Sequence, residues 1–370
     1  MRIDSIEIFH LALPRTCPQE TAFGTLDNLE TVLVRISSGP QAGWGEASPG
    51  NAPSASPEWA AGVFGCIRDW LSPALVGHSF RSGAELDQRW LSVRGNRFAK
   101  AALDAAWWDL KARMEQKPLD ELLGGRRKAI ELGVSFDRMA SIDELLAAMA
   151  AAFEEGFARV ELKLRPGWDV SMLNVVRHEF PVETIHADVE GALHLDDMEI
   201  LCRLDDFSLA MVEQPLPADD LVGLAMVQET IRTPVCLDEA ISTLEQAEMA
   251  LELKSGQYVN VEPGRVGGLT VAAAIHDACH EQCVPCYVGA MPQTAIGLRH
   301  GLALASKPNF TYPADYIGPE RLLKRDVAEP PKLARPIDGK LSAELWTEPG
   351  IGVEPDPACL EEFCLARAKV

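Results

Sequence analysis

Five charged residues recur at an almost constant interval through the middle of the chain. They are Lys163, Asp188, Glu213, Asp238 and Glu262, and the intervals between them are 25, 25, 25 and 24 residues. Each lies near the carboxyl end of a short apolar stretch. Side chains alternate across a strand, so these five would share the face opposite the apolar residues. The pattern predicts that successive strands carry charged side chains to one common site.

The predicted site holds many more carboxylates than amines. Its inward-facing acidic residues, set against Lys163, are Glu161, Asp188, Glu190, Glu213, Asp238 and Glu262. Crowded carboxylates cannot all stay ionised in a partly dry site without a compensating charge. Mg²⁺ supplies such a charge and prefers carboxylate oxygens. We therefore expect Mg²⁺, or Mn²⁺ in its place, to be held by Asp188, Glu213 and Asp238. The alternative is that these residues form one solvated face of an antiparallel sheet.

The elements that would position these residues alternate between strand and helix. Strand-like stretches occur at 130–136, 160–164, 184–190, 209–213, 235–238, 258–262, 284–288 and 309–312. Helix-length segments separate them, and Ser141 and Ser242 stand where helix N-caps are expected. Eight such units favour a (β/α)8 TIM-type barrel over an open sheet. No Gly-x-Gly-x-x-Gly follows the first strand, which argues against a dinucleotide-binding fold.

The N-terminal part follows a different pattern. Residues 3–13, 31–37 and 43–46 predict a β-meander, and 59–70 and 98–116 have helical periodicity. We expect one domain at 1–125, the barrel at 126–319, and a C-terminal segment at 320–370 that returns to the N-terminal domain.

Composition narrows the classes of function. The 370 residues include 55 acidic and 34 basic side chains, for a net charge of −21. Such a field repels phosphate, so we expect no nucleic acid and no anionic membrane as partners. The longest apolar run, 145–153, is shorter than the ~20 residues of a membrane span. The first residues lack a secretory signal, which predicts a cytoplasmic protein. Nine cysteines at this density do not indicate a disulfide framework.

Several motifs spread over nearly the whole chain resemble those of one enzyme family. They are Gly43-Trp44-Gly45-Glu46, residues 101–110, residues 118–125, Glu161-Leu162-Lys163, Asp188, Val212-Glu213-Gln214-Pro215, Leu237-Asp238-Glu239, residues 263–269, 310–313 and 324–326, and Pro349 to Val353. The chain resembles the muconate-lactonizing branch of the enolase superfamily. Within that branch it is most similar to the o-succinylbenzoate synthase and N-acylamino acid racemase group.

The resemblance implies a fold and a chemistry. It implies a modified barrel under an α+β capping domain, with Mg²⁺ on Asp188, Glu213 and Asp238. The shared reaction is abstraction of a proton α to a carboxylate, which gives a metal-stabilised enediolate. Lys163 matches the second lysine of the family's Lys-x-Lys motif and is therefore the candidate base. The substrate would be a small molecule with a carboxylate group. The chain could also form a homo-oligomer.

The chain departs from the family pattern at several positions. Glu161 stands in place of the first lysine of the motif, and Glu262 in place of a lysine on the sixth strand. Glu190 and Gln293 replace a usual asparagine and a usual glutamate. Two-lysine racemisation is therefore doubtful. Lys163 and Glu262 could act as an unlike pair in a dehydratase or epimerase, Lys163 could act alone, or the two could form a salt bridge in an inactive metal-binding homologue.

Other residues complete the predicted surroundings of the site. Around the substrate and the metal ligands we expect Glu161, Glu190, Glu239, Thr21, Phe23 and Gln293, with Thr21 and Phe23 on a cap loop. We expect His186, two residues before Asp188, to be a barrel-core histidine rather than a ligand. Cys279-x3-Cys283-x2-Cys286 has the spacing of radical S-adenosylmethionine enzymes, so an iron–sulfur enzyme is a remote alternative.

Overall fold

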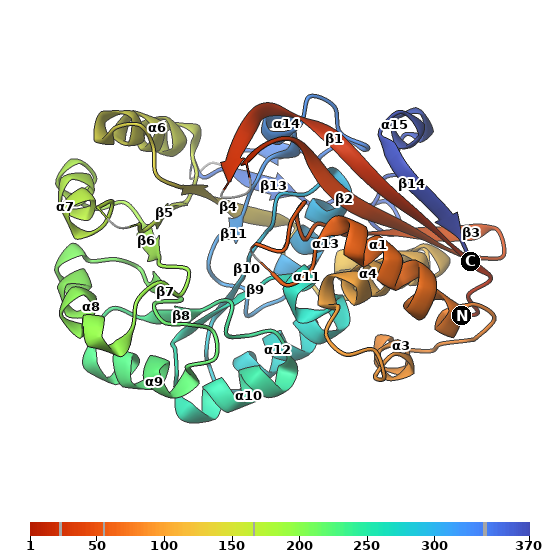
Figure 1. Cartoon of the computed structure of the whole chain (residues 1–370), viewed down its shortest axis with the longest axis horizontal. Helices are drawn as coiled ribbons and strands as arrows, with labels where there is room; N and C mark the ends of the chain where they lie inside the picture. The colour runs from red at the N-terminus through yellow and green to blue at the C-terminus, as the bar shows by residue number, and fades with distance from the viewer. Residues whose placement is uncertain (22–23, 55, 166, 336–338) are drawn as a thin grey trace.

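The computed structural model describes residues 1–21, 24–54, 56–165, 167–335 and 339–370. One part of the chain is a four-stranded antiparallel sheet with the order β14-β1-β2-β3. Its strands are β1 (Ser5–Thr21), β2 (Gly24–Ser38), β3 (Gln41–Ala47) and β14 (Cys364–Lys369). The two ends of the chain therefore lie side by side in one sheet (Figure 1).

Helices cover one face of this sheet and complete the α+β cap. They are α1 (Ala60–Cys66), a π-helical turn (Ile67–Leu71), α2 (Ser72–Leu75), α3 (Gly83–Arg89), α4 (Arg97–Met114) and α5 (Leu119–Leu122). Strand β3 lies directly against α4. A Cβ built on Gly43 would lie 2.2 Å from the backbone nitrogen of Leu110, and one on Gly45 would lie 2.1 Å from the carbonyl oxygen of Ala102. Only glycine permits this approach of strand and helix.

The second part is built on parallel strands. They are β4 (Ala129–Phe136), β5 (Arg159–Lys163), β6 (Ile185–Asp188), β7 (Val212–Glu213), β8 (Val235–Leu237), β9 (Tyr258–Val261), β10 (Cys286–Val288) and β11 (Ala314–Asp315). Strands β4 to β10 are hydrogen-bonded in sequence order. Phe310 forms a parallel bridge with Cys286, and β11 pairs in parallel with β4. Residues 310–315 therefore lie between β10 and β4 and connect the two edges of the parallel sheet. The architecture is the predicted modified TIM-type barrel with a cap.

In the cap, β1 ends eight residues after the predicted end at 13, and β2 begins seven residues before the predicted start at 31. The predicted barrel strands agree with the structure to within a few residues, with one larger shift. The eighth strand was expected at 309–312, whereas β11 is Ala314–Asp315 and residue 310 contributes only an isolated bridge.

Helices surround the barrel strands (Figure 1). They are α6 (Ile142–Glu155), α7 (Val170–Glu179), α8 (Met198–Leu204), α9 (Leu221–Thr230), α10 (Leu244–Leu253), α11 (Pro263–Val266), α12 (Leu269–Glu281) and α13 (Ala295–Ala305), with 3-10 turns at Leu195–Asp197 and Asp205–Phe207. Ser141 caps α6 as expected, since its side chain accepts from the Glu144 N–H. The expected cap at Ser242 is wrong by one residue, because Thr243 caps α10.

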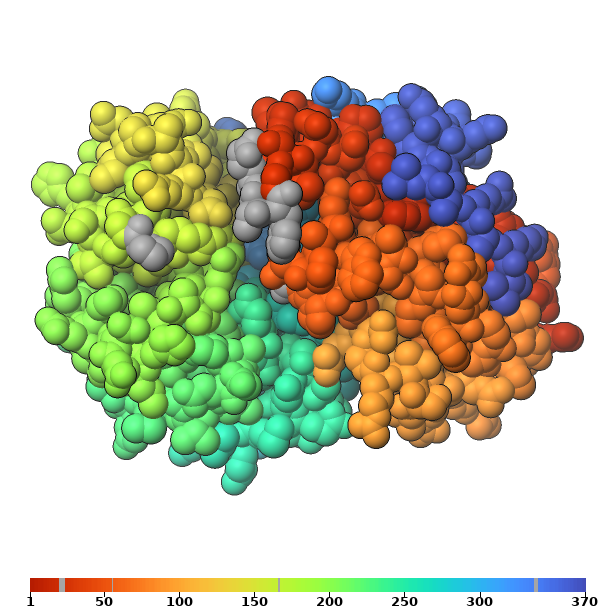
Figure 2. Space-filling view, in the orientation of Figure 1, coloured from red at the N-terminus to blue at the C-terminus, as the bar shows by residue number. Residues whose placement is uncertain are grey.

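The C-terminal segment contacts both parts of the molecule. Its elements are α14 (Pro319–Leu322), β12 (Leu333–Ala334), β13 (Ser342–Glu344), α15 (Pro357–Glu362) and β14. Strand β13 pairs antiparallel with barrel strand β4, whereas β14 pairs with β1 of the cap. Figure 2 shows these last residues (blue) against the N-terminal segments (red).

Two buried carboxylates join the cap to the barrel. Glu46 of β3 accepts hydrogen bonds from the N–H groups of Thr294 (3.0 Å) and Gly297 (2.7 Å) at the start of α13. Asp104 of α4 accepts from the N–H of Thr270 (2.9 Å) in the first turn of α12. The cap is thereby fixed over the barrel by hydrogen bonds to the starts of two helices. Within the described residues, no helix has the length and apolar character that crossing a bilayer requires.

Candidate active site

Lys163 lies at the end of β5, surrounded by carboxylates. Its Nζ is 2.7 Å from Asp188, 2.8 Å from Glu190 and 3.3 Å from Glu161. Burial alone would lower the pKa of this amine. The three carboxylates outweigh burial and raise the pKa of Lys163 well above its ordinary value. In this arrangement Lys163 is a firmly held ammonium ion.

The three predicted metal ligands end adjacent strands. Asp188 and Glu213 are register partners, and Glu213 is paired with Cys236, two residues before Asp238. The side-chain oxygen of Gln214 accepts from the Asp238 N–H at 3.0 Å and so helps to fix the turn that carries this ligand. The strands that carry the three carboxylates are thus adjacent in the sheet.

Each of these carboxylates has a partner within the protein. Asp188 contacts Lys163, and Asp238 is paired with both terminal nitrogens of the Arg265 guanidinium. Glu213 accepts from the Asn260 amide nitrogen at 2.8 Å and from the Tyr287 hydroxyl. Burial, with added repulsion from neighbouring carboxylates, raises the pKa of Asp188 and of Asp238. A divalent cation would relieve that repulsion, so the donor chemistry fits such an ion.

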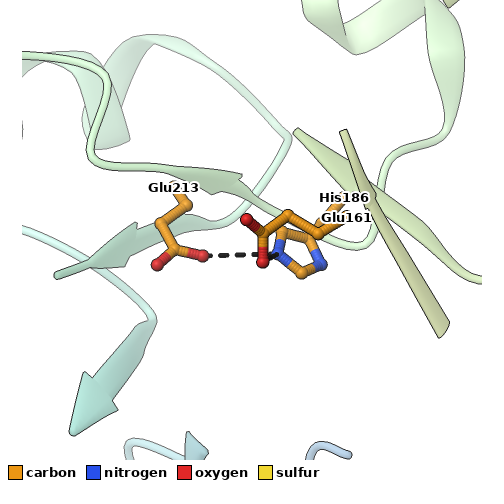
Figure 3. A group of neighbouring side chains, drawn as sticks. All are labelled: Glu161, His186 and Glu213. Atoms are coloured by element: carbon orange, nitrogen blue, oxygen red, sulfur yellow. Dashed lines mark ion pairs between the residues drawn. The ribbon is translucent and has the colours of Figure 1, made fainter. Parts of the chain in front are cut away.

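A different trio of side chains lies closest together. Glu161, His186 and Glu213 place one ligand atom each within 4.8 Å of the others, and among the described residues no other group of three or more His, Cys, Asp or Glu side chains does so. Figure 3 shows the His186 ring beside the Glu161 carboxylate, with one ring nitrogen facing Glu213. The structure therefore places the expected core histidine next to a predicted metal ligand. The carboxylates of Asp188 and Asp238 stand apart from this trio.

A layer of aromatic and charged residues lies beside the trio. The guanidinium of the fully buried Arg159 is paired with Asp315 and is 3.4 Å from Glu161. It stacks 5.2 Å from the ring centre of Tyr287 and 5.5 Å from that of Tyr312. These cation–π and ionic contacts neutralise part of the acidic interior.

Glu262 does not join the Lys163 cluster. Its two carboxylate oxygens accept from the N–H groups of Gly264 (2.9 Å) and Arg265 (2.5 Å), so it is the N-cap of α11. Among the described residues, the ion pairs of Lys163 are those with Glu161, Asp188 and Glu190. The alternative of a Lys163–Glu262 salt bridge is therefore wrong. Glu262 and Gln293 instead line a small cavity of about 40 Å³ between cap and barrel.

Glu190 has an unusual backbone conformation at the rim of the barrel. Its φ is 51°, in the left-handed region that asparagine tolerates better than glutamate. Its carboxylate bridges Lys163 and Arg165, with 2.7 Å to the latter. Glu239, next to Asp238, has a buried Oε2 with no hydrogen-bond partner among the described residues. Thr21 ends β1, and Phe23 lies outside the described residues.

Two cations that balance the inward carboxylates, Arg159 and Arg265, were not predicted from the sequence. Arg159 was overlooked although it continues the alternation Glu161, Lys163, Arg165 by one step toward the start of β5. Arg265 comes from a short helix, so strand alternation could not reveal it. The excess of carboxylates is consequently smaller than expected. Among the described residues, Cys279, Cys283 and Cys286 do not form a group whose ligand atoms all lie within 4.8 Å of one another, and Cys283 is exposed while the other two are buried.

Comparison with known proteins places this site in a family. Residues 144–359 match the family described as enolase C-terminal domain-like, and residues 4–124 match the mandelate racemase / muconate lactonizing enzyme N-terminal domain. The chain belongs to the enolase superfamily.

Relatives in this superfamily span the full chain. An o-succinylbenzoate synthase from Geobacillus kaustophilus is 36% identical over 364 residues, covering 98% of this chain and 96% of that protein. An N-succinylamino acid racemase from Amycolatopsis sp is 36% identical over 368 residues and 99% of both chains. A solved structure of an enolase-superfamily member from Enterococcus faecalis V583 has a TM-score of 0.93 at 33% identity, covering 100% of this chain and 99% of that one.

Membership confirms the resemblance and the fold class predicted from the sequence. The protein is an enzyme of the lyase or isomerase type found in this superfamily, and it uses a divalent metal ion. A radical S-adenosylmethionine enzyme, the remote alternative, does not agree with a superfamily match that covers both parts of the chain.

Proposed function

We propose that this enzyme abstracts a proton α to the carboxylate of a small molecule, with Lys163 as the single base, in an o-succinylbenzoate-synthase-like reaction. The observation that carries the proposal is the 2.7 Å contact between Lys163 and Asp188. A base must reach the α-proton while the substrate carboxylate is held nearby, and neighbouring strand ends satisfy that need.

Asp188, Glu213 and Asp238 would hold Mg²⁺, or Mn²⁺ in its place. When bound, the ion would act as a Lewis acid that stabilises negative charge developing on the substrate carboxylate. Asp188 would exchange its contact with Lys163 for the ion, which removes one of three carboxylates from the amine. The pKa of Lys163 would then fall toward the range in which it accepts a proton.

The absence of a second lysine favours a lyase over a racemase. Racemisation needs an acid and a base on opposite faces of the α-carbon, and position 262 carries a carboxylate that caps α11. A dehydration needs one base to remove the proton and return it to the leaving hydroxyl. Lys163 alone could perform both steps from one side.

A direct test is formation of o-succinylbenzoate by the purified chain with and without Mg²⁺. We expect metal-dependent turnover, reduced by ~10²-fold or more in Asp238→Asn. In a parallel assay with N-succinyl amino acids, solvent deuterium should enter from one enantiomer only. Rapid exchange on both enantiomers would show that a second base is present and would contradict the one-base proposal.

A further inference from the structure

The barrel interior contains a nitrogen atom aimed between two carboxylates. His186 Nε2 lies 3.3 Å from Oε2 of Glu161 and 3.3 Å from Oε2 of Glu213 (Figure 3). Glu161, His186 and Glu213 are 4%, 0% and 2% exposed. Both contacts are at ion-pair distance, but neither has the geometry of a hydrogen bond, so Nε2 lacks a well-formed hydrogen bond among the described residues. Burying a polar atom without a well-formed hydrogen bond costs free energy, so a ligand bound to Nε2 would stabilise the folded protein.

The spacing of these atoms matches metal coordination by nitrogen and oxygen. Bonds from Zn²⁺ to imidazole nitrogen and carboxylate oxygen are about 2.0–2.2 Å, and tetrahedral geometry then separates neighbouring ligand atoms by roughly 3.4 Å. The two observed separations from Nε2 are both 3.3 Å. Imidazole donors favour first-row transition ions, whereas Mg²⁺ favours oxygen donors alone.

We propose that Glu161, His186 and Glu213 bind a divalent transition cation of the Zn²⁺ class inside the barrel. The site lies two residue pairs below the Lys163–Asp188 level, since Glu161 and His186 are register partners on β5 and β6. It is distinct from the set Asp188, Glu213 and Asp238, with which it shares Glu213.

Neighbouring groups already hold each donor in place. The other ring nitrogen of His186 lies 3.1 Å from the Tyr312 hydroxyl. With Nδ1 donating its proton to that oxygen, Nε2 presents its lone pair to the cation. Glu213 is fixed by Asn260 and Tyr287. Supporting contacts of this kind are what orient metal ligands.

The charges around the site favour a divalent ion. Burial lowers the pKa of His186, but Glu161 and Glu213 outweigh burial and raise it, so a bound cation would take the place of a ring proton. With the imidazole then neutral, Glu161, Glu213 and Asp315 carry three negative charges, and Arg159 contributes one positive charge. A dication would cancel the remainder. Lys163 also contacts Glu161, through Oε1 rather than the Oε2 that lies near His186, but Asp188 and Glu190 share that ammonium.

Pulsed electron paramagnetic resonance of Mn²⁺ separates this site from the carboxylate set. The metal-stripped full chain is loaded with Mn²⁺ alone, and ¹⁴N coupling reports a histidine on the ion. We expect ¹⁴N coupling in the wild type and in Asp238→Asn, because Asp238 belongs only to the set Asp188, Glu213 and Asp238. We expect none in His186→Gln or Glu161→Gln. Zn²⁺ should displace the nitrogen-coupled Mn²⁺ far better than an equal concentration of Mg²⁺.

The wild-type spectrum decides the proposal even where a variant fails to fold. Bound Mn²⁺ without ¹⁴N coupling, no bound Mn²⁺ at all, or coupling that persists in His186→Gln would overturn it. Folding of each variant is checked by thermal unfolding, and Glu161→Lys, which restores the residue of the family motif, is a second test of the Glu161 donor. This experiment involves no turnover. Nitrogen coupling in a chain that makes no o-succinylbenzoate would refute the proposed function but would still support a metal site at Glu161, His186 and Glu213.

Discussion

The ammonium of Lys163 lies 2.7 Å from the carboxylate of Asp188, its register partner on the next strand. This contact joins the proposed base to the proposed metal ligand. Because a cation on Asp188 competes with Lys163 for the same oxygen, metal binding and base strength should be coupled. The rate should rise with pH as Lys163 loses its proton. This ascending limb of the pH–rate profile should move to higher pH when Mg²⁺ is limiting.

Glu190→Asn should make Lys163 easier to deprotonate. The change removes one of three carboxylates that raise the pKa of Lys163. We expect the ascending limb of the pH–rate profile, which reports deprotonation of Lys163, to lie at lower pH than in the wild type. An unchanged limb would show that Glu190 does not act on the base.

The matched variant Glu190→Gln separates charge from backbone strain. Both variants lose the charge, but asparagine tolerates the left-handed φ of 51° better than glutamine. Glu190→Asn should therefore unfold with a free energy about 0.5–1 kcal/mol higher than Glu190→Gln. Equal stabilities, measured by denaturant unfolding, would argue against strain at this residue.

Glu262→Gln should affect stability more than turnover. The carboxylate caps α11 through two backbone N–H groups, and loss of such a cap costs about 0.5–2 kcal/mol. With Lys163 as the single base, turnover should stay within a few-fold of the wild type. A loss of ~10²-fold or more in a folded variant would instead identify Glu262 as an acid or base.

Gly45→Ala should destabilise the cap strongly. The added Cβ would lie 2.1 Å from the Ala102 carbonyl oxygen, so β3 and α4 must separate. We expect a loss of at least about 1–3 kcal/mol. Gly65 in α1 is the matched control, because a Cβ there meets no atom within 4 Å. Gly65→Ala should raise stability by about 0.5–1 kcal/mol, and similar effects of the two substitutions would contradict the packing described.

Asp104 should make the protein less stable as pH rises from about 4 to about 7. Burial raises the pKa of Asp104 from 3.8 to about 7, against the lowering effect of its bonds to Thr270. Between these values the folded state binds more protons than the unfolded state, so its stability falls with pH by at most about 1.4 kcal/mol per pH unit. Asp104→Asn removes the titrating group. The difference in unfolding free energy between variant and wild type should therefore change across this range, and a constant difference would contradict the assignment.

Much of the fold followed from spacing alone. An interval of about 25 residues is one strand plus one helix, and identical intervals place strand ends at one height. The last strand was misplaced because Phe310 has strand-like neighbours but makes only one bridge. The cap at Thr243 was missed because Ser242 and Thr243 are chemically equivalent in the sequence, and only backbone geometry distinguishes them.

The contacts inside the barrel could be predicted less well. Alternation shows which residues of a strand point inward, so it located Lys163, Asp188 and Glu213. It does not show how far a long side chain reaches, and Glu213 turns toward His186 and Tyr287 rather than toward Asp238. Arg265 neutralises Asp238 from a four-residue helix that has no periodicity to read. The assignment of Asp188, Glu213 and Asp238 as metal ligands therefore stays a prediction.

The central claim is that Lys163 removes the α-proton. The most direct measurement is the rate of o-succinylbenzoate formation by Lys163→Ala at saturating Mg²⁺, with Lys163→Arg as a control that keeps the charge but cannot act as a base near neutral pH. We expect both variants to fold, to bind metal and to lose turnover by ~10²-fold or more. Full activity in either folded variant would contradict the account, because Glu262 or a water molecule would then have to be the base.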